Sequence, residues 1–570
     1  MVWIELTHIL SYFSIAHNAE NKNKGEEIMK KRFRSVLVIL LIAALMLTGC
    51  AGQTSADNAK STQSTEAQAP AGAPTGGKSA KDTMVIAVAG DIPSLKGAQN
   101  SRTTASLTWP TLFTLHETQT GGYEYVIDEQ SIAQKAEWSD DKQTLVITLK
   151  EGVTMHNGST LTADDVVFSI ALECDTTNNL NASPNMPTDG SGVEKVDEKT
   201  VKLTFNTVSV NNWNLAAQFR VFDKESYEAS GAQDLQTYGM DPAHFVSYGP
   251  YRFTEFSAGD HLSFEKFDNY FAGNDSTIQH ITIRRIDEST VAMMELQTGG
   301  VDVIMYPANS DIVDVENGTY DNIKYTSAAG LYQQLVVFNL DASSLCADAN
   351  VRKALCYAMN RQAMWEGAFE SSGLFADTPV TRTQEFIETY DEPYPQDLEK
   401  AKQMLVDAGI PEGTTFTVCV DNDTYRTTAV EMFKNVMTGM GYQVDIKTGD
   451  NAAYLNDVLY TTDWDLEFGK SGMVGSVAYW VKSQWNLFNH GNTAKEDFTA
   501  FYAMEDEILA EFDDEARYQL TQNFMNAYVN DYCISYPIRQ DVYGNLMAKD
   551  LEGFSRWGEQ WNVVGAYFSK

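Results

Sequence analysis

Alternating and helical spacings of apolar residues begin near residue 84 and continue to the end of the chain. Leu145, Ile147 and Leu149 alternate with polar residues and predict a strand. A variant capping box formed by Thr162 and Asp165 then predicts the start of a helix. The pattern in this part of the chain therefore indicates a strand, a turn and a helix.

Strand and helix patterns alternate again in the second half of the chain. Asp397 is placed to begin a helix that ends at Gly409. Alternation over 416–420 predicts a strand, a helical pattern follows and ends at Gly441, and alternation returns over 442–446. A strand, a helix and a strand of these lengths predict a βαβ crossover, and hence parallel strands in one sheet.

A basic segment and an apolar run lie near the start of the sequence. Residues 30–34 include four cationic side chains, and residues 36–47 are all apolar. As a helix this run would be about 18 Å long, which is too short for a bilayer core of roughly 30 Å. The pattern is typical of a secretory signal peptide, which we place at residues 29–49.

Cys50 ends this run in the sequence Leu-Thr-Gly-Cys, which resembles the lipobox of bacterial lipoproteins. In those proteins the chain is cut before the cysteine, and the sulfur carries a diacylglycerol. The resemblance predicts lipidation of Cys50. Residues 1–28 fit no part of a signal sequence, and we interpret them as an upstream mistranslation before the true start at Met29.

Residues 50–83 have the composition of a flexible linker. From Ala51 to Thr83 there is no aromatic residue and no Leu, Ile, Val or Met, so this segment cannot bury a core. As a coil it would reach about 30 Å. Residues 72–79 match the phosphate-loop pattern GxxxxGKS, but no strand precedes them, so we interpret the match as chance.

The net charge and the reactive side chains argue against several classes of function. The formal net charge of −37 argues against nucleic-acid binding, because both partners would be negative. The eight histidines are scattered, and neither HExxH nor GxSxG occurs. His156 is interpreted as a structural hydrogen-bonding residue. The sequence therefore predicts no catalytic site, no cofactor and no enzymatic activity.

The remaining cysteines give no sign of a metal site. They form no CxxC motif and have no paired histidine, so we predict neither zinc nor another bound metal. We expect most of them to be buried thiols, and the pairing of Cys174 or Cys346 stays open. The set comprises Cys174, Cys346, Cys356, Cys419 and Cys533.

Residues 138–169 carry a specific order of features: a Trp, an acidic turn, an alternating strand, Gly-Val, a His, and then Ala-Asp-Asp-Val before Phe-Ser. This order resembles the family 5 extracellular solute-binding proteins, which include oligopeptide-, dipeptide- and nickel-binding proteins of importers. Lys150, Met155 and Asn157 are mild departures from the family pattern. Further landmarks, such as the Gly-Pro-Tyr turn at 249–251, extend the resemblance over about residues 84–570.

The resemblance implies an α/β fold of the periplasmic-binding-protein type, specifically type II, in the large cluster with an extra subdomain. Two lobes would be joined by two hinge crossings. We expect the first lobe with its inserted subdomain over 84–335, the second lobe over 336–533, and a return to the first lobe over 534–570. In this family the ligand lies between the lobes, which close like a clamp.

The strand and loop over 464–476 are the most informative stretch for the ligand. Peptide-binding relatives commonly supply an Asp here that pairs with the amino terminus of the ligand, whereas this chain has Lys-Ser-Gly-Met. That departure leaves open longer peptides held through backbone groups, or neutral oligosaccharides. Tryptophans after the loop offer stacking surfaces. The predicted ligand-binding residues are Trp109, Asn339, Gly469, Lys470, Ser471, Met473, Ser476, Trp480 and Trp485.

Together these patterns predict a monomeric, lipid-anchored protein on the extracytoplasmic face of the cell membrane. It would bind a peptide, foremost an oligopeptide, and deliver it to the permease subunits of an ABC importer. An oligosaccharide or another small solute in the same fold is the first alternative. An extracellular hydrolase would need a nucleophile, a base and an orienting group, which we cannot assemble, and a sensory or chaperone-like surface protein is the remaining alternative.

Overall fold

The computed structural model describes residues 79–90, 92, 95, 106–118, 122–175, 185–472, 475–488, 494, 496–557 and 560–570. The predicted signal peptide, Cys50 and nearly all of the predicted linker lie outside these residues. Among the helices of this described part, none combines the length and apolar character needed to cross a bilayer.

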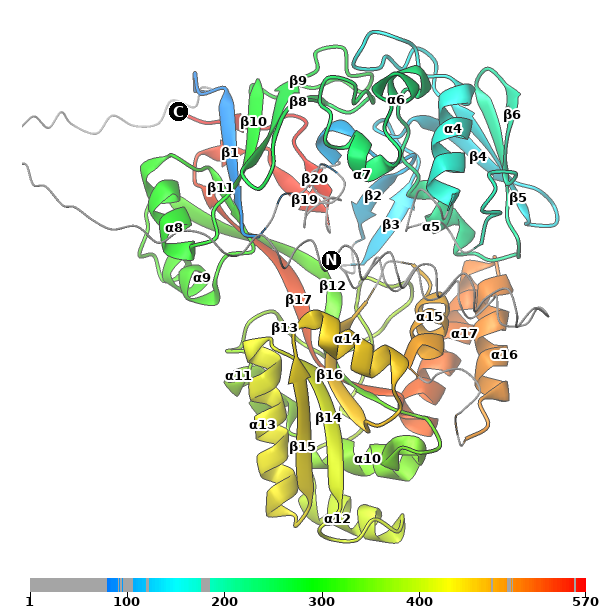
Figure 1. Cartoon of the computed structure of the whole chain (residues 1–570), viewed down its shortest axis with the longest axis vertical. Coiled ribbons are helices and arrows are strands. Elements are labelled where there is room, and N and C mark those ends of the chain that lie inside the picture. The colour runs from blue at the N-terminus through cyan, green and yellow to red at the C-terminus, as the bar shows by residue number, and fades with distance from the viewer. Residues whose placement is uncertain are drawn as a thin grey trace, which may run out of the picture. The chain divides into compact units, whose positions relative to one another are not determined.

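Eleven of the described strands form one sheet (Figure 1). One of them, β13 (Leu374–Phe375), pairs with β17 beside the main path. In spatial order, the other strands are β15 (Gln443–Gly449), β14 (Thr415–Asp421), β16 (Leu466–Ser471), β12 (Ile323–Phe338), β17 (Ser535–Ala548), β11 (Val303–Met305), β1 (Thr83–Val88), β10 (His280–Arg285), β9 (His261–Lys266) and β8 (Tyr251–Ser257).

The two longest strands, β12 and β17, connect the two halves of this sheet. They run antiparallel, with a register irregularity between Ala329 and Gln333. Beyond the irregularity β12 pairs with β16 on one side, whereas the other end of β17 pairs with β11. At Gly330 a Cβ would lie 2.5 Å from the Asp541 carbonyl oxygen, so only glycine permits this close crossing. The two strands are the two hinge crossings of the fold.

The second lobe is built on β14, β15 and β16. Phe416, Phe433 and Leu466 are fully buried in its core. Strands β14 and β15 are parallel and joined by α13, which confirms the predicted βαβ crossover. The helices of this lobe are α10 (Ala349–Ala358), α11 (Arg361–Gly367), α12 (Leu398–Asp407), α13 (Thr424–Gly439), α14 (Asn451–Tyr460), α15 (Val477–Phe488), α16 (Thr499–Ala510) and α17 (Asp514–Asn526).

The first lobe has its own core against β1, β8, β9 and β10, in which Ile86, Phe264 and Ile283 are buried. Strands β1 and β10 are parallel, and β8 and β9 form an antiparallel hairpin. Its shorter elements are β2 (Thr114–Glu117), β3 (Tyr123–Val126), α6 (Lys224–Ser230), α7 (Leu235–Tyr238), α8 (Ser289–Thr298), α9 (Asn309–Glu316), β18 (Leu551–Glu552), β19 (Ser555–Trp557), β20 (Gln560–Asn562) and β21 (Tyr567–Phe568).

A four-stranded antiparallel sheet forms the extra subdomain, with a third core of its own. Leu145, Ile147 and Leu149 are buried there, which confirms the strand predicted from their alternation. The backbone N–H of Thr162 donates to Asp165 Oδ2 at 2.9 Å, which confirms the predicted capping box. The elements are β4 (Ala133–Trp138), β5 (Thr144–Leu149), β7 (Thr200–Thr204), β6 (Val193–Asp197), α4 (Ala163–Cys174) and α5 (Asn212–Ala217).

Candidate functional site

The end of β16 and the start of α15 bring two of the predicted ligand residues together. The Trp480 indole Nε1 donates to Ser471 Oγ at 3.2 Å, and both residues are buried. Ser471 also lies opposite Gln333 of the crossing strand β12. The loop between strand and helix is therefore anchored at both of its ends and lies beside the hinge.

A small, mainly apolar pocket lies next to this contact. Its wall combines the hinge strands with the start of α15, and Trp480 forms part of it. An indole in such a pocket offers a rigid apolar surface and one N–H donor, and here this N–H donates to Ser471 Oγ. The lining residues are Leu335, Val337, Phe338, Leu340, Ser471, Trp480, Val481, Tyr528, Ile534 and Ser535.

The same loop contacts a second segment at residues 384–385. The backbone N–H of Glu385 donates to the Gly475 carbonyl at 3.0 Å, and Gln384 and Gly475 form an isolated parallel bridge. Neither atom of the Gln384 carboxamide, nor Ser476 Oγ, has a hydrogen-bond partner among the described residues. Gln384 is 4% exposed and Ser476 2%, so these polar atoms are buried, where polar groups normally form hydrogen bonds.

The extra subdomain approaches this loop through the first turn of α5. A Cβ at Gly475 would lie 2.4 Å from Asn214 Nδ2 and 2.8 Å from Asn211 Oδ1. Gly475 also has a φ of +104°, which side chains rarely adopt. Glycine at this position therefore allows the subdomain and the second lobe to meet.

Neutral amide side chains continue from here into the hinge. Gln333 Nε2 donates to the Thr378 carbonyl at 3.1 Å, and Gln540 Nε2 donates to the Gly330 carbonyl at 3.0 Å. All of these side chains are buried. We call the set of Asn211, Asn214, Gln333, Gln384 and Gln540 the amide belt. It offers donors and acceptors without net charge, which suits neutral polar groups better than ions.

The other predicted ligand residues lie in different surroundings. Trp109 packs in the core of the first lobe, edge-on to Phe222 and Phe245. Asn339 is fully buried, and its Nδ2 donates to the Trp464 carbonyl at 2.7 Å, so it holds the backbone after β12.

Lys470 is exposed on β16, where its ammonium lies 5.4 Å from the centre of the Tyr332 ring. At the neighbouring Gly469, a Cβ would lie 2.8 Å from the Tyr454 hydroxyl. The prediction at Met473 falls outside the described residues, as does the side chain of Trp485 on α15.

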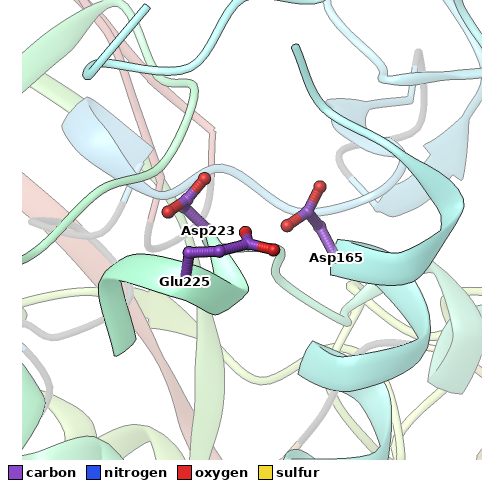
Figure 2. Close-up of side chains that lie close together, drawn as sticks. All are labelled: Asp165, Asp223 and Glu225. Carbon is purple, nitrogen blue, oxygen red and sulfur yellow. The ribbon is translucent and has the colours of Figure 1, made fainter. Parts of the chain in front are cut away.

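One acidic cluster of the described residues has a spacing compatible with a metal ion (Figure 2). Asp165, Asp223 and Glu225 have carboxylate oxygens within 4.8 Å of one another. Asp165 accepts from the backbone of Thr162, and Asp223 accepts from the backbone of Ser226. Asp165 is therefore the capping-box partner of Thr162 in α4, and Asp223 is the N-cap of α6. Burial raises the pKa of Asp165.

Sequence reasoning missed the amide belt. Asn211, Asn214 and Gln384 are ordinary polar residues in their local segments, whereas Gln333 and Gln540 lie on the two crossing strands β12 and β17. The signal that identifies them is burial without charge, which the sequence pattern does not reveal. His156 was predicted to be a structural hydrogen-bonding residue, and its Nε2 does contact the Gly249 carbonyl at 3.0 Å.

Two lobes with separate cores, joined by two crossing strands and accompanied by an extra subdomain, form the fold of the type II periplasmic binding proteins. Residues 129–495 match the family model of the bacterial extracellular solute-binding proteins, family 5. The chain belongs to this family. It is a solute-binding protein that acts outside the cytoplasm, and it is not an enzyme.

Over the aligned residues, characterised relatives are about a quarter identical to this chain. It is 26% identical to heme-binding protein A of Haemophilus influenzae over 302 residues, which are 50% of this chain and 54% of that protein. It therefore matches about half the length of this relative. It is 26% identical to the oligopeptide-binding protein AppA of Bacillus subtilis over 388 residues, 67% of each chain.

Solved structures resemble nearly the whole described chain. The ABC transporter substrate binding protein CtaP of Listeria monocytogenes superposes with a TM-score of 0.69 at 22% identity, covering 86% of this chain and 99% of CtaP. AppA of Bacillus subtilis in complex with a nonapeptide gives 0.64 at 17% identity, covering 87% of this chain and all of AppA. At these identities the likeness shows the fold.

Proposed function

We propose that this protein is the lipid-anchored solute-binding component of an ABC importer and that it binds an oligopeptide between its lobes by clamp closure. The anchor would be a diacylglycerol on Cys50, and residues 50–83 would hold the monomeric binding domain off the membrane. Permease subunits in the membrane would receive the ligand. The two crossing strands support closure, because few backbone segments need to change for the lobes to move.

The buried carboxamide of Gln384 is the observation that carries the peptide proposal. Leaving a buried amide without partners costs roughly 1–3 kcal/mol. A peptide unit presents one N–H and one C=O, which can pair with both atoms of the carboxamide at once. The Ser476 hydroxyl, which also has no hydrogen-bond partner among the described residues, follows Gly475, and Gln333 and Gln540 of the amide belt lie on the two hinge strands.

The residues of the loop support an extended peptide over a dipeptide fixed by its amino terminus. Lys470 and Ser471 end β16 and Gly472 follows it, in place of an acidic side chain that would pair with an ammonium group. Backbone contacts and neutral amides tolerate different side chains, as binding of varied oligopeptides requires. Among the relatives, AppA of Bacillus subtilis is named as oligopeptide-binding and has been solved with a nonapeptide.

A neutral oligosaccharide is the second candidate ligand. Sugar hydroxyls both donate and accept hydrogen bonds, so the amide belt fits them chemically as well. Trp480 adds an apolar ring surface of the kind on which sugars stack. The two ligand classes differ in the groups that they present, because a peptide offers alternating N–H and C=O groups whereas a neutral sugar offers hydroxyls.

Native mass spectrometry of the protein purified from its own host would identify the bound ligand class. Titration calorimetry with oligopeptides and with neutral oligosaccharides then measures affinity for each class. We expect peptide binding, and we expect Gln384→Ala to weaken it by about 5- to 100-fold, the equivalent of roughly 1–3 kcal/mol. Gln403→Ala is the matched control, because Gln403 is exposed on α12. Binding of sugars alone, or equal affinities of the two variants, would contradict the peptide proposal.

The anchor is tested separately from the ligand. Cys50→Ser removes the thiol that would carry the lipid, so the protein should leave the membrane fraction and appear in the medium or periplasm. Metabolic labelling with a fatty acid should mark the parent protein and not this variant. Labelling that persists in Cys50→Ser would show that the lipid is attached elsewhere.

A further inference from the structure

The helix α10 and the segment that leads into β17 present two thiols to each other. Cys356 Sγ and Cys533 Sγ lie 3.5 Å apart, although the residues are 177 positions apart in sequence. Both side chains are fully buried in the core of the second lobe. A disulfide has an S–S distance of about 2.05 Å, so an approach of about 1.5 Å would join them.

One cationic side chain, that of Arg352, anchors the backbone on both sides of this contact. Arg352 lies one helical turn before Cys356 on α10, so both face the same way. Its guanidinium Nε donates to the carbonyls of Tyr532 and Cys533 at 2.9 and 3.2 Å. Cys533 has a φ of +47°, an uncommon conformation for a residue with a side chain. The thiol of Cys533 is therefore fixed in place opposite Cys356.

The electrostatic surroundings differ for the two sulfurs. Burial raises the pKa of the Cys356 thiol well above its usual value. Burial acts in the same direction on Cys533, but the hydrogen bond from Cys356 and the nearby Arg352 outweigh it and lower the pKa of that thiol. In the folded lobe Cys533 therefore has the more acidic thiol of the pair.

We propose that Cys356 and Cys533 are a disulfide-forming pair that, when oxidised, ties α10 to the start of β17. Family membership places the chain outside the cytoplasm, where disulfides persist. The oxidant is a disulfide, either of a small thiol such as glutathione or of an oxidoreductase. This inference is independent of which ligand the protein binds.

The exchange conserves atoms and electrons. One of the two cysteines, as a thiolate, attacks one sulfur of the oxidant, forms a mixed disulfide and releases the first thiol of the oxidant. The other cysteine then loses its proton and attacks the sulfur of its partner, which forms the Cys356–Cys533 bond and releases the second thiol. The protein loses two hydrogen atoms, and the oxidant gains them. Because both thiols are buried in the folded lobe, the exchange belongs to folding, before the core closes over them.

The other cysteines provide internal controls. Cys346 belongs to the same core, so it is the competing partner, whereas Cys419 and Cys174 lie in two other clusters. Cys174 and Cys346 are thus in separate cores, so they do not pair with each other. The pair Cys356 and Cys533 was not foreseen from sequence because the two residues are 177 positions apart in the chain.

The test is to refold the full chain with oxidised glutathione, alkylate the remaining thiols and map peptides without reduction. We expect a linked peptide that contains Cys356 and Cys533, and alkylated Cys174, Cys346 and Cys419. A melting midpoint about 5 °C or more above that of the reduced protein should accompany the link. Alkylation of both Cys356 and Cys533, or a link from either to Cys346, would overturn the proposal.

Cysteine variants distinguish the effect of the Cys356–Cys533 disulfide from general effects of substitution on stability. Cys356→Ala should abolish both the linked peptide and the difference between the oxidised and reduced melting midpoints. Cys419→Ala, which removes an equally buried thiol from another cluster, should keep both. Cys356→Ala is preferred to a change at Cys533, where the positive φ could itself impair folding. A redox-dependent midpoint that persists in Cys356→Ala would show that the link is not the cause.

Discussion

The Tyr454 hydroxyl donates a hydrogen bond to Glu467 Oε2 at 2.5 Å in the interior of the second lobe. Glu467 lies on β16 opposite Val337 of the hinge strand β12, and it is 1% exposed. Burial raises the pKa of its carboxyl to about 8, although the hydrogen bond from Tyr454 and the charge of Arg426 act in the opposite direction. A carboxyl group that keeps its proton at neutral pH therefore lies directly beside the hinge.

Glu467 should make the protein less stable as the pH rises. In the unfolded chain it ionises near its ordinary pKa of 4.5, whereas in the folded chain it stays protonated up to about 8. Its contribution to stability is therefore complete below 4.5 and is lost as the pH rises through 8, with a slope of at most about 1.4 kcal/mol per pH unit. Urea unfolding over this pH range should show the slope, and Glu467→Gln should reduce it by the contribution of this one carboxyl. An unchanged slope in Glu467→Gln would contradict this account, and Glu431→Gln, on the exposed face of α13, is the control.

His156 should make the protein less stable as the pH falls. Burial lowers its pKa from 6.5 to about 4, so the folded protein keeps this imidazole neutral. The unfolded chain takes up a proton near 6.5, and the free energy of unfolding therefore falls as the pH drops from 6.5 to 4. His156→Gln should flatten this part of the profile, measured in the Glu467→Gln background because the two effects oppose each other between 4.5 and 6.5. His280→Gln, at an exposed position, should leave the profile unchanged.

Gly475→Ala should weaken ligand binding by more than its effect on folding stability explains. The added Cβ would collide with Asn211 and Asn214 of the extra subdomain, and the left-handed φ adds strain. Gly413→Ala is the matched control, since Gly413 has a φ of +85° but no atom within 4 Å of the added Cβ. We expect both variants to lose a similar 1–2 kcal/mol or so of stability. Only Gly475→Ala should weaken binding of the ligand identified by mass spectrometry, by about tenfold or more. Equal affinities in calorimetry would show that this contact is not part of closure.

Arg352→Ala should be strongly destabilising. The guanidinium is fully buried and donates to three carbonyls as well as to Glu496, at 2.7 Å. Removing one side of a buried charged network costs about 3–5 kcal/mol. Arg252→Ala should cost less than about 1 kcal/mol, because Arg252 and its partner Glu265 are exposed. Denaturant unfolding measures both variants, and equal losses would mean that the network around Arg352 contributes little.

The sequence alone gave the local elements of this protein correctly. Alternation at 145–149, the cap at Thr162 and the βαβ pattern up to Ile446 depend on neighbours a few residues away, so they are readable without the fold. The family landmarks placed the chain in its fold class, because they record the same local order of turns and strands.

The ligand-facing chemistry could not be predicted in the same way. Gln384, Gly475 and Asn214 come from a loop, a strand-to-helix turn and a short helix that are far apart in sequence. Glutamine side chains are mostly exposed in proteins, so the residue type does not reveal that Gln384 is buried with no hydrogen-bond partner among the described residues. Trp480 has the residue type of a stacking platform, whereas its burial and its hydrogen bond to Ser471 follow only from how α15 packs on β16.

The periodicity, the predicted export signal and the fold class of this protein were therefore determined by its sequence, since each depends on short-range patterns. The tertiary structure alone decided that two thiols 177 residues apart would be neighbours and that the Gln384 carboxamide would be buried with no hydrogen-bond partner among the described residues. Both facts arise from long-range packing, in which the position of a side chain is set by segments distant in the chain rather than by its sequence neighbours.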